Sequence, residues 1–139
     1  GLATITPASG FVGPVPAMII GLVAGLACYT AVNLKSKFGY DDSLDVVGVH
    51  GVGGIIGSLA VGLFASKAVN PAGQNGLFFG NPSLFNIQLE AVCATIVFTL
   101  VATYFILKFI DIAVGLRVDE ETEFLGLDHS LHGESGYTS

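Results

Sequence analysis

Long runs of apolar residues dominate this chain. From Phe11 to Asn33, 23 residues follow one another without a charged side chain, and from Val46 to Ser66 another 21 do so. A third run extends from Leu84 to about Gly115, with charged residues only towards its ends. Because an α-helix rises 1.5 Å per residue, about 20 residues cross a hydrocarbon core about 30 Å thick. The pattern predicts an all-α membrane protein with three spanning helices, at about residues 11–34, 43–66 and 84–116.

Two polar connections separate the apolar runs. The first, Lys35 to Asp45, is short, and the second, Lys67 to Ser83, is rich in Pro, Gly and Asn, a composition typical of loops. Asn81-Pro82-Ser83 is a suitable entry to the third helix. Three residues at the start of the second helix offer oxygens and negative charge that can cap it: Asp41, Asp42 and Ser43.

The basic residues predict the orientation of the helices. If the three helices alternate in direction, one side of the membrane receives four of the five basic residues: Lys35, Lys37, Lys108 and Arg117. Lys67 stands alone on the other side. The positive-inside rule makes the first side cytoplasmic. We therefore expect a membrane region at residues 1–118 and a cytoplasmic tail at residues 119–139, in a protein of the plasma membrane.

Composition excludes several classes of function. Hydrophobic residues make up 52% of the chain and charged residues only 12%, a membrane composition, and five Lys and Arg residues cannot line a nucleic-acid backbone. No nucleophile–base pair, metal-ligand cluster or phosphate-binding loop is visible, so we expect neither an enzyme nor a bound metal or cofactor. Cys28 and Cys93 lie in apolar runs, where thiols behave as small hydrophobes rather than disulfide partners.

Glycine is dense in the first two predicted helices. Gly53 and Gly57 are four residues apart, as are Gly21 and Gly25, and this spacing lets membrane helices approach closely. Three helices supply few neighbours for so many small residues. The chain also begins without a signal peptide, with a segment typical of a protein interior. We therefore expect it to be the C-terminal part of a larger helical bundle.

His50 is the one ionisable side chain inside the second apolar run. It lies eight residues, about 12 Å, beyond a helix start at Asp42, which predicts a position near the middle of the bilayer. Such a residue usually faces a cavity or a partner, because burying its charge in lipid is costly. A buried histidine bonded to a carbonyl and a pore-lining group remain alternatives on these grounds. A metal ligand is disfavoured, since no second ligand recurs on the same helix face.

Four segments in order resemble the ammonium transporter family (Amt/Mep, related to the Rhesus glycoproteins). They are "ATITPASGFVG" at residues 3–13, "DDSLDVVGVHGVGGIIGSLAVGLFA" at 41–65, "DIAVGLRV" at 111–118 and "GLDHSLHGESGY" at 126–137. The resemblance implies a fold of eleven helices with inverted repeats, assembled as a homotrimer with one pore per subunit. This chain would supply helices nine to eleven and the tail.

The resemblance also implies roles for residues near the second helix. His50 matches the second of the family's twin pore histidines, and Val46 matches an apolar residue lining the same pore. Asp45 matches an acidic position at the helix entrance, where we expect a structural cap rather than contact with the permeant, ammonium or ammonia. The first pore histidine and the outer gate would belong to helices outside this chain. An ammonium sensor and a non-transporting fragment remain alternatives.

The tail resembles a cytoplasmic segment that folds against the membrane domain and a neighbouring subunit. Ser130 falls where some relatives carry a phosphorylatable hydroxyl, and a PII-type signalling protein would be the expected partner in bacteria. We expect His129 and His132 to form hydrogen bonds rather than bind metal. The other tail positions carried over from the family motif are Gly126, Asp128, Gly133 and Glu134.

Overall fold

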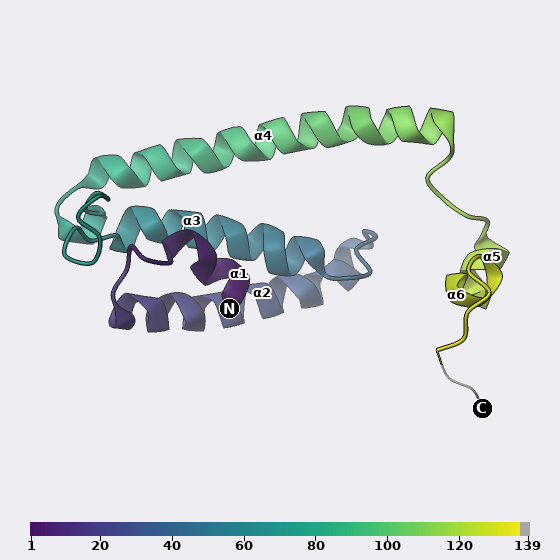
Figure 1. The fold of residues 1–139 in the computed structure, drawn as a ribbon, viewed down its shortest axis with the longest axis horizontal. Helices are drawn as coiled ribbons and strands as arrows, with labels where there is room; N and C mark the ends of the chain where they lie inside the picture. Colours follow the sequence, from purple (N-terminus) through teal and green to yellow (C-terminus); the bar gives the residue numbers. More distant parts are fainter. Residues whose placement is uncertain (137–139) are drawn as a thin grey trace. The chain divides into compact units, whose positions relative to one another are not determined.

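The computed structural model describes residues 1–136, and every regular element in that range is helical (Figure 1). Three of its helical segments are long and apolar enough to cross a membrane. The α-helices are α1 (Leu2–Ile5), α2 (Pro14–Phe38), α3 (Val52–Phe64), α4 (Pro82–Ala113), α5 (Glu120–Leu125) and α6 (Leu127–Ser130). The tighter turns are the 3₁₀-helices η1 (Thr6–Ala8) and η3 (Leu77–Phe79), and the wider one is the π-helix η2 (Val47–Gly51).

The ends of the spanning helices differ from the predicted ones for local reasons. The predicted helix 11–34 runs from Pro14 to Phe38, because proline suits the first helical position and Gly39 ends the helix with a left-handed φ of 65°. The predicted helix 84–116 begins at Pro82 for the same reason and ends at Ala113. The predicted helix 43–66 begins only at Val47 and ends at Phe64.

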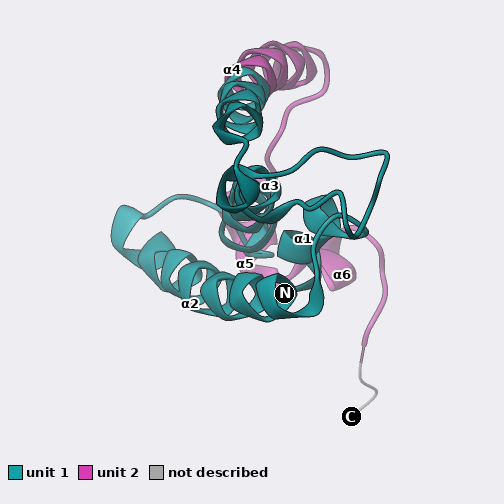
Figure 2. Ribbon diagram, turned by 90° about the vertical axis from the view of Figure 1, so that its left-hand side faces the viewer, with its two compact units in different colours: residues 1–96 teal, residues 97–139 magenta. Residues whose placement is uncertain are grey.

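The chain divides into two compact units, residues 1–96 and residues 97–139, with the boundary inside α4 (Figure 2). In the first unit α2 and α3 lie side by side, and α1 packs against α3. Its small core is formed by Ala8, Ile20 and Ala60. Burial in this unit is therefore concentrated where the short N-terminal segment meets the two longer helices.

Close contact between α1 and α3 depends on glycine, as the Gly53 and Gly57 spacing predicts. A Cβ added at Gly57 would lie 2.0 Å from the carbonyl oxygen of Thr4, and one at Gly53 would lie 2.7 Å from the Thr4 hydroxyl. Thr4 is fully buried. A Cβ at Gly21 or Gly25 would meet no atom within 4 Å. The α3 pair is thus packed within this chain, whereas the α2 pair faces outward from it.

The loop after α3 folds back onto the end of that helix. The Ser66 amide donates to the Phe11 carbonyl oxygen at 2.9 Å, and the Gly76 amide donates to the Ala65 carbonyl oxygen at 2.7 Å. The rings of Phe64 and Phe78 lie 5.0 Å apart between their centroids. These contacts order the segment that leads into α4.

The helix α4 has 32 residues, about 48 Å at the α-helical rise, and none of its residues is buried. It is longer than a hydrocarbon core about 30 Å thick, as the third apolar run predicts. Cys93, on this helix, is an exposed free thiol, and Cys28 on α2 is also free. The chain therefore leaves a large apolar surface for lipid or other helices to cover.

Two short helices, α5 and α6, form the described part of the tail. The carboxylate of Asp119 caps α5 by accepting hydrogen bonds from the Thr122 amide at 2.8 Å and from its hydroxyl at 2.9 Å. These bonds favour the ionised carboxylate and lower the pKa of Asp119 below its usual 3.8. The tail positions 137–139, including Tyr137 of the family-like motif, lie outside the described residues.

Candidate functional site

The entrance to the second membrane helix contains an unusual turn. The Asp45 amide donates to the Asp42 carbonyl oxygen at 3.1 Å, and Asp45 adopts a left-handed φ of 57°. The Asp42 carboxylate then accepts hydrogen bonds from the amides of Val46 and Val47 at 2.8 and 2.9 Å. Asp42, one of the three predicted capping candidates, is therefore the residue that caps this helix. Because Asp45 is left-handed, the helix begins only at Val47.

The helix opens with the π-helical turn η2, which contains His50. The Val52 amide bonds to the carbonyl oxygen of Val47, five residues earlier, whereas an α-helix would use the residue four earlier. Gly48 is buried in this turn, and a Cβ there would lie 2.8 Å from a methyl carbon of Val32 on α2. Such wide turns occur frequently at functional sites.

Lys35 joins the last turn of α2 to the turn before η2. Its Nζ donates to the carbonyl oxygen of Asp42 at 2.8 Å and forms an ion pair with the carboxylate of Asp45. The side chains of Lys35 and Asp45 are 26% and 37% exposed. The expected role of Asp45 as a cap of its own helix is thus replaced by a link to the neighbouring helix, because the Asp42 carboxylate already occupies the free amides.

His50 lies in the first turn of its helix, so the predicted position eight residues into the helix is wrong. The left-handed turn at Asp45 shifts the helix start from the predicted Asp42 to Val47. His50 is exposed in this chain, and Val46, four residues earlier, is 47% exposed. On the covered side, the Cys28 thiol lies 3.9 Å from the carbonyl oxygen of Val49. The structure thus brings His50 and Val46 to the same uncovered helix entrance.

The tail residues singled out from the sequence lie together around α6. The Ser130 hydroxyl donates to the Gly126 carbonyl oxygen at 2.7 Å, and the Glu134 amide donates to the Asp128 carbonyl oxygen at 2.9 Å. The His132 amide donates to the Leu127 carbonyl oxygen at 3.3 Å. Gly133 adopts a positive φ of 62°. These bonds fold the segment after Gly126 into a compact turn with its side chains exposed.

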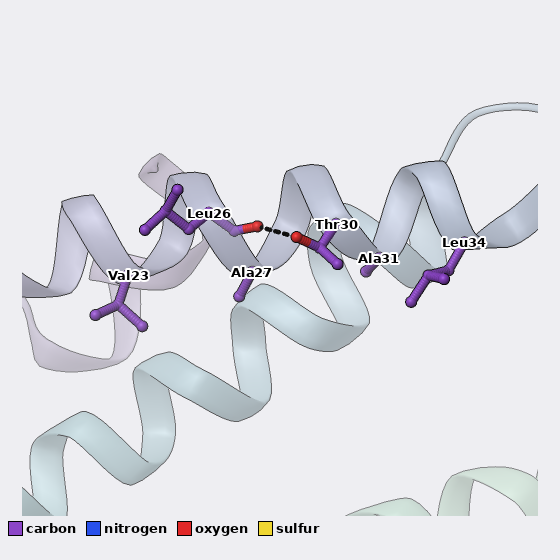
Figure 3. A pocket seen from close by; sticks show the side chains of 6 residues that line it. All are labelled: Val23, Leu26, Ala27, Thr30, Ala31 and Leu34. Atoms are coloured by element: carbon purple, nitrogen blue, oxygen red, sulfur yellow. Dashed lines mark hydrogen bonds between the residues drawn. The ribbon is translucent and has the colours of Figure 1, made fainter.

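Other places in the described residues offer less chemistry. A hollow on the surface of α2 is lined almost wholly by apolar side chains, and its one hydroxyl, that of Thr30, bonds back to Leu26 at 2.7 Å (Figure 3). Within residues 1–136, no group of three or more His, Cys, Asp and Glu side chains could hold a metal ion. The helix entrance around His50 is therefore the candidate site.

Sequence reasoning missed two features of this site. The first is the π-helical turn, and the second is the link from Lys35 to Asp45. A signal for the link was present, since two basic residues in the last turn of a helix, Lys35 and Lys37, precede an acidic connection by a few residues. No sequence signal predicts the turn, because its shape depends on contact with another helix.

Comparisons with known proteins agree with the family-like segments. The model of the Ammonium Transporter Family matches residues 1–137. An ammonium transporter of Bacillus subtilis is 50% identical over 99% of this chain and 34% of its own length. Ammonium transporter Amt1 of Archaeoglobus fulgidus is 49% identical over 99% of this chain and 35% of its own length.

A solved structure agrees as well. The crystal structure of Mep2 from Saccharomyces cerevisiae matches with a TM-score of 0.77 and 38% identity, covering 85% of this chain and 28% of that one. The chain thus spans about a third of the relatives it matches, and its placement at helices nine to eleven remains a prediction. With an all-helical fold, three candidate membrane spans and a family match over nearly every residue, the chain is an integral membrane protein of the ammonium transporter family.

Proposed function

We propose that this chain forms part of an ammonium transport pathway, with His50 and Val46 lining the pore. The observation that carries the proposal is the placement of His50. It is exposed in a π-helical turn at a helix entrance, in a chain whose family match covers residues 1–137. The exposed imidazole is accessible from the side that further helices of the complete protein would cover.

The chemistry of imidazole suits this role. An ammonium ion loses its hydration on entering a narrow apolar passage, and an unpaired charge in such surroundings is very costly. Neutral imidazole offers one hydrogen-bond donor and one acceptor, so it can bind ammonia or exchange a proton with it. Val46 would keep the neighbouring wall apolar, which disfavours hydrated cations.

The test is uptake of methylammonium by the full-length protein in a cell without its own ammonium transporters. We expect His50→Ala to abolish uptake or to change its selectivity, while His129→Ala, a change of the same residue type in the tail, leaves the pore rate intact. Both variants are compared at equal amounts in the membrane. Unchanged flux and selectivity in His50→Ala would sink the assignment.

We further propose that the complete protein is a homotrimer in the plasma membrane with its C-terminus in the cytoplasm. The positive-inside pattern of the lysines supports this orientation. The folded tail around Ser130 would contact the cytoplasmic face and a neighbouring subunit, and a PII-type protein is the proposed bacterial partner. Uptake that is unaltered by Ser130→Asp would argue against regulation at this residue.

A further inference from the structure

Asp45 is the one residue other than glycine with a positive φ among residues 1–136. Side chains of L-amino acids rarely adopt this conformation, and it persists only where the surrounding contacts enforce it. Aspartate adopts this conformation more often than most residues, though less readily than glycine, and Asp45 is followed directly by the helical turn that carries His50. Strain and the candidate functional residue are therefore five positions apart in one short segment.

Lys35 contacts this turn at two points. Its Nζ holds two groups of the turn at once, the carbonyl oxygen of Asp42 and the carboxylate of Asp45. The two accepting groups lie at the two ends of one tight turn. The Asp45 amide closes this turn by donating to the Asp42 carbonyl oxygen at 3.1 Å. Lys35 thus ties the turn to the last turn of α2.

The turn is in direct hydrogen-bond contact with the backbone around His50. The carbonyl oxygen of Asp45 accepts from the Val49 amide at 2.8 Å, and Val49 is the residue before His50. On the same segment the Asp42 carboxylate binds the amides of Val46 and Val47. A change in the backbone of Asp45 must therefore move the start of η2 and with it the His50 side chain.

We propose that Lys35 is a positioning residue for His50. By holding Asp42 and Asp45 together, it keeps the entrance in the left-handed turn followed by the π-helix, and so sets where the imidazole lies. The inference rests on the proposed function of His50 as a pore residue. Lys35 itself contacts neither the permeant nor the imidazole.

The simpler explanation is that Lys35 only places positive charge at a helix end. That charge would favour the helix dipole and the membrane orientation. Lys37 provides the matched control, because it lies in the same last turn of α2 and is exposed. A role in charge alone would make the two lysines equivalent, whereas a positioning role belongs to Lys35.

The experiment compares Lys35→Gln with Lys37→Gln in the full-length protein. Methylammonium uptake gives the maximal rate and the KM, and nuclear magnetic resonance of labelled histidine gives the ring signals of His50, assigned by their loss in His50→Ala. We expect Lys35→Gln to shift the His50 signals and to lower the maximal rate about tenfold with little change in KM, since misplacement of a reacting group affects conduction more than entry. Lys37→Gln should leave both readouts unchanged.

Further variants separate positioning from loss of folding. Lys35→Arg, which keeps the charge, should retain most of the rate, and Asp45→Asn should reproduce the shift of the His50 signals. The double variant of Lys35→Gln and Asp45→Asn should be no worse than Lys35→Gln alone, because Asp45→Asn weakens a link that Lys35→Gln already removes. Additive losses in the double variant would overturn the proposal.

The outcomes distinguish this inference from the function on which it rests. Equal effects of Lys35→Gln and Lys37→Gln, or unmoved His50 signals in Lys35→Gln, overturn the positioning role while His50→Ala still abolishes transport. Unchanged transport in His50→Ala overturns both the proposed function and the positioning role.

Discussion

Substitution of Gly57 by alanine tests the packing that holds α1 against α3. The added Cβ would lie 2.0 Å from the Thr4 carbonyl oxygen, whereas ordinary contact begins at 3.4 Å, so the backbones must separate by 3.4 − 2.0 = 1.4 Å. A helix backbone cannot rotate away as a side chain can. Overpacking costs up to about 3 kcal/mol, and alanine recovers about 1 kcal/mol of helix propensity. We expect a net loss of about 2 kcal/mol.

Labelling of Cys28 measures this loss in the 139-residue chain in detergent micelles. The Cys28 thiol lies beside Gly53, where an added Cβ would be 3.4 Å from it, so separation of α1 from α3 should expose it to a maleimide. Cys93 is exposed and serves as the internal reference. Titration with a denaturing detergent gives the free energy of opening from the Cys28 labelling rate.

The matched control is Gly54→Ala, three residues before Gly57 on the same helix. A Cβ at Gly54 meets no atom within 4 Å, so this variant should be as stable as the parent or more stable by up to about 1 kcal/mol. Equal stability of Gly57→Ala and Gly54→Ala would refute the reasoning, because it would mean that the close approach of Thr4 contributes nothing.

Two further predictions concern the helix caps. Asp42→Ala should destabilise the helix entrance by about 1 kcal/mol, which hydrogen exchange measures as faster exchange at the amides of Val46 and Val47. The control variant Ser43→Ala should leave the exchange of these two amides unchanged. Equal exchange in the two variants would contradict the cap. The cap of α5 should persist above pH 3.8 and be lost as the pH falls through the lowered pKa of Asp119. A pH titration of the Thr122 amide resonance measures this loss. A titration midpoint at or above pH 3.8 would contradict the prediction.

The sequence predicts the helices well because a membrane span depends mainly on apolar length. It also predicts the close approach at Gly53 and Gly57, although not the partner, Thr4. The helix entrance could not be predicted in the same way. Its start depends on an aspartate in the left-handed conformation, which few residues other than glycine adopt, and on its ion pair with a lysine from another helix. The contact of Gly48 with Val32 likewise exists only after the two helices pack.

The candidate site shows the same division between pattern and tertiary contact. His50 stands out in the sequence as the one ionisable residue of an apolar run, so its candidacy needs no structure. Its place in the first turn, and the link through Asp45 to Lys35, follow from contacts between segments. The family-like segments identify the residue, and the structure adds how it is held.

Ion selectivity shows whether His50 lies in the path of the permeant. The full-length protein and its His50→Ala variant are reconstituted in liposomes, and the fluxes of ammonium and potassium are measured in parallel. We expect the variant to lose ammonium flux or to admit potassium, because its side chain can neither receive the proton nor bind ammonia. An unchanged ratio of the two fluxes at an unchanged ammonium rate would contradict it.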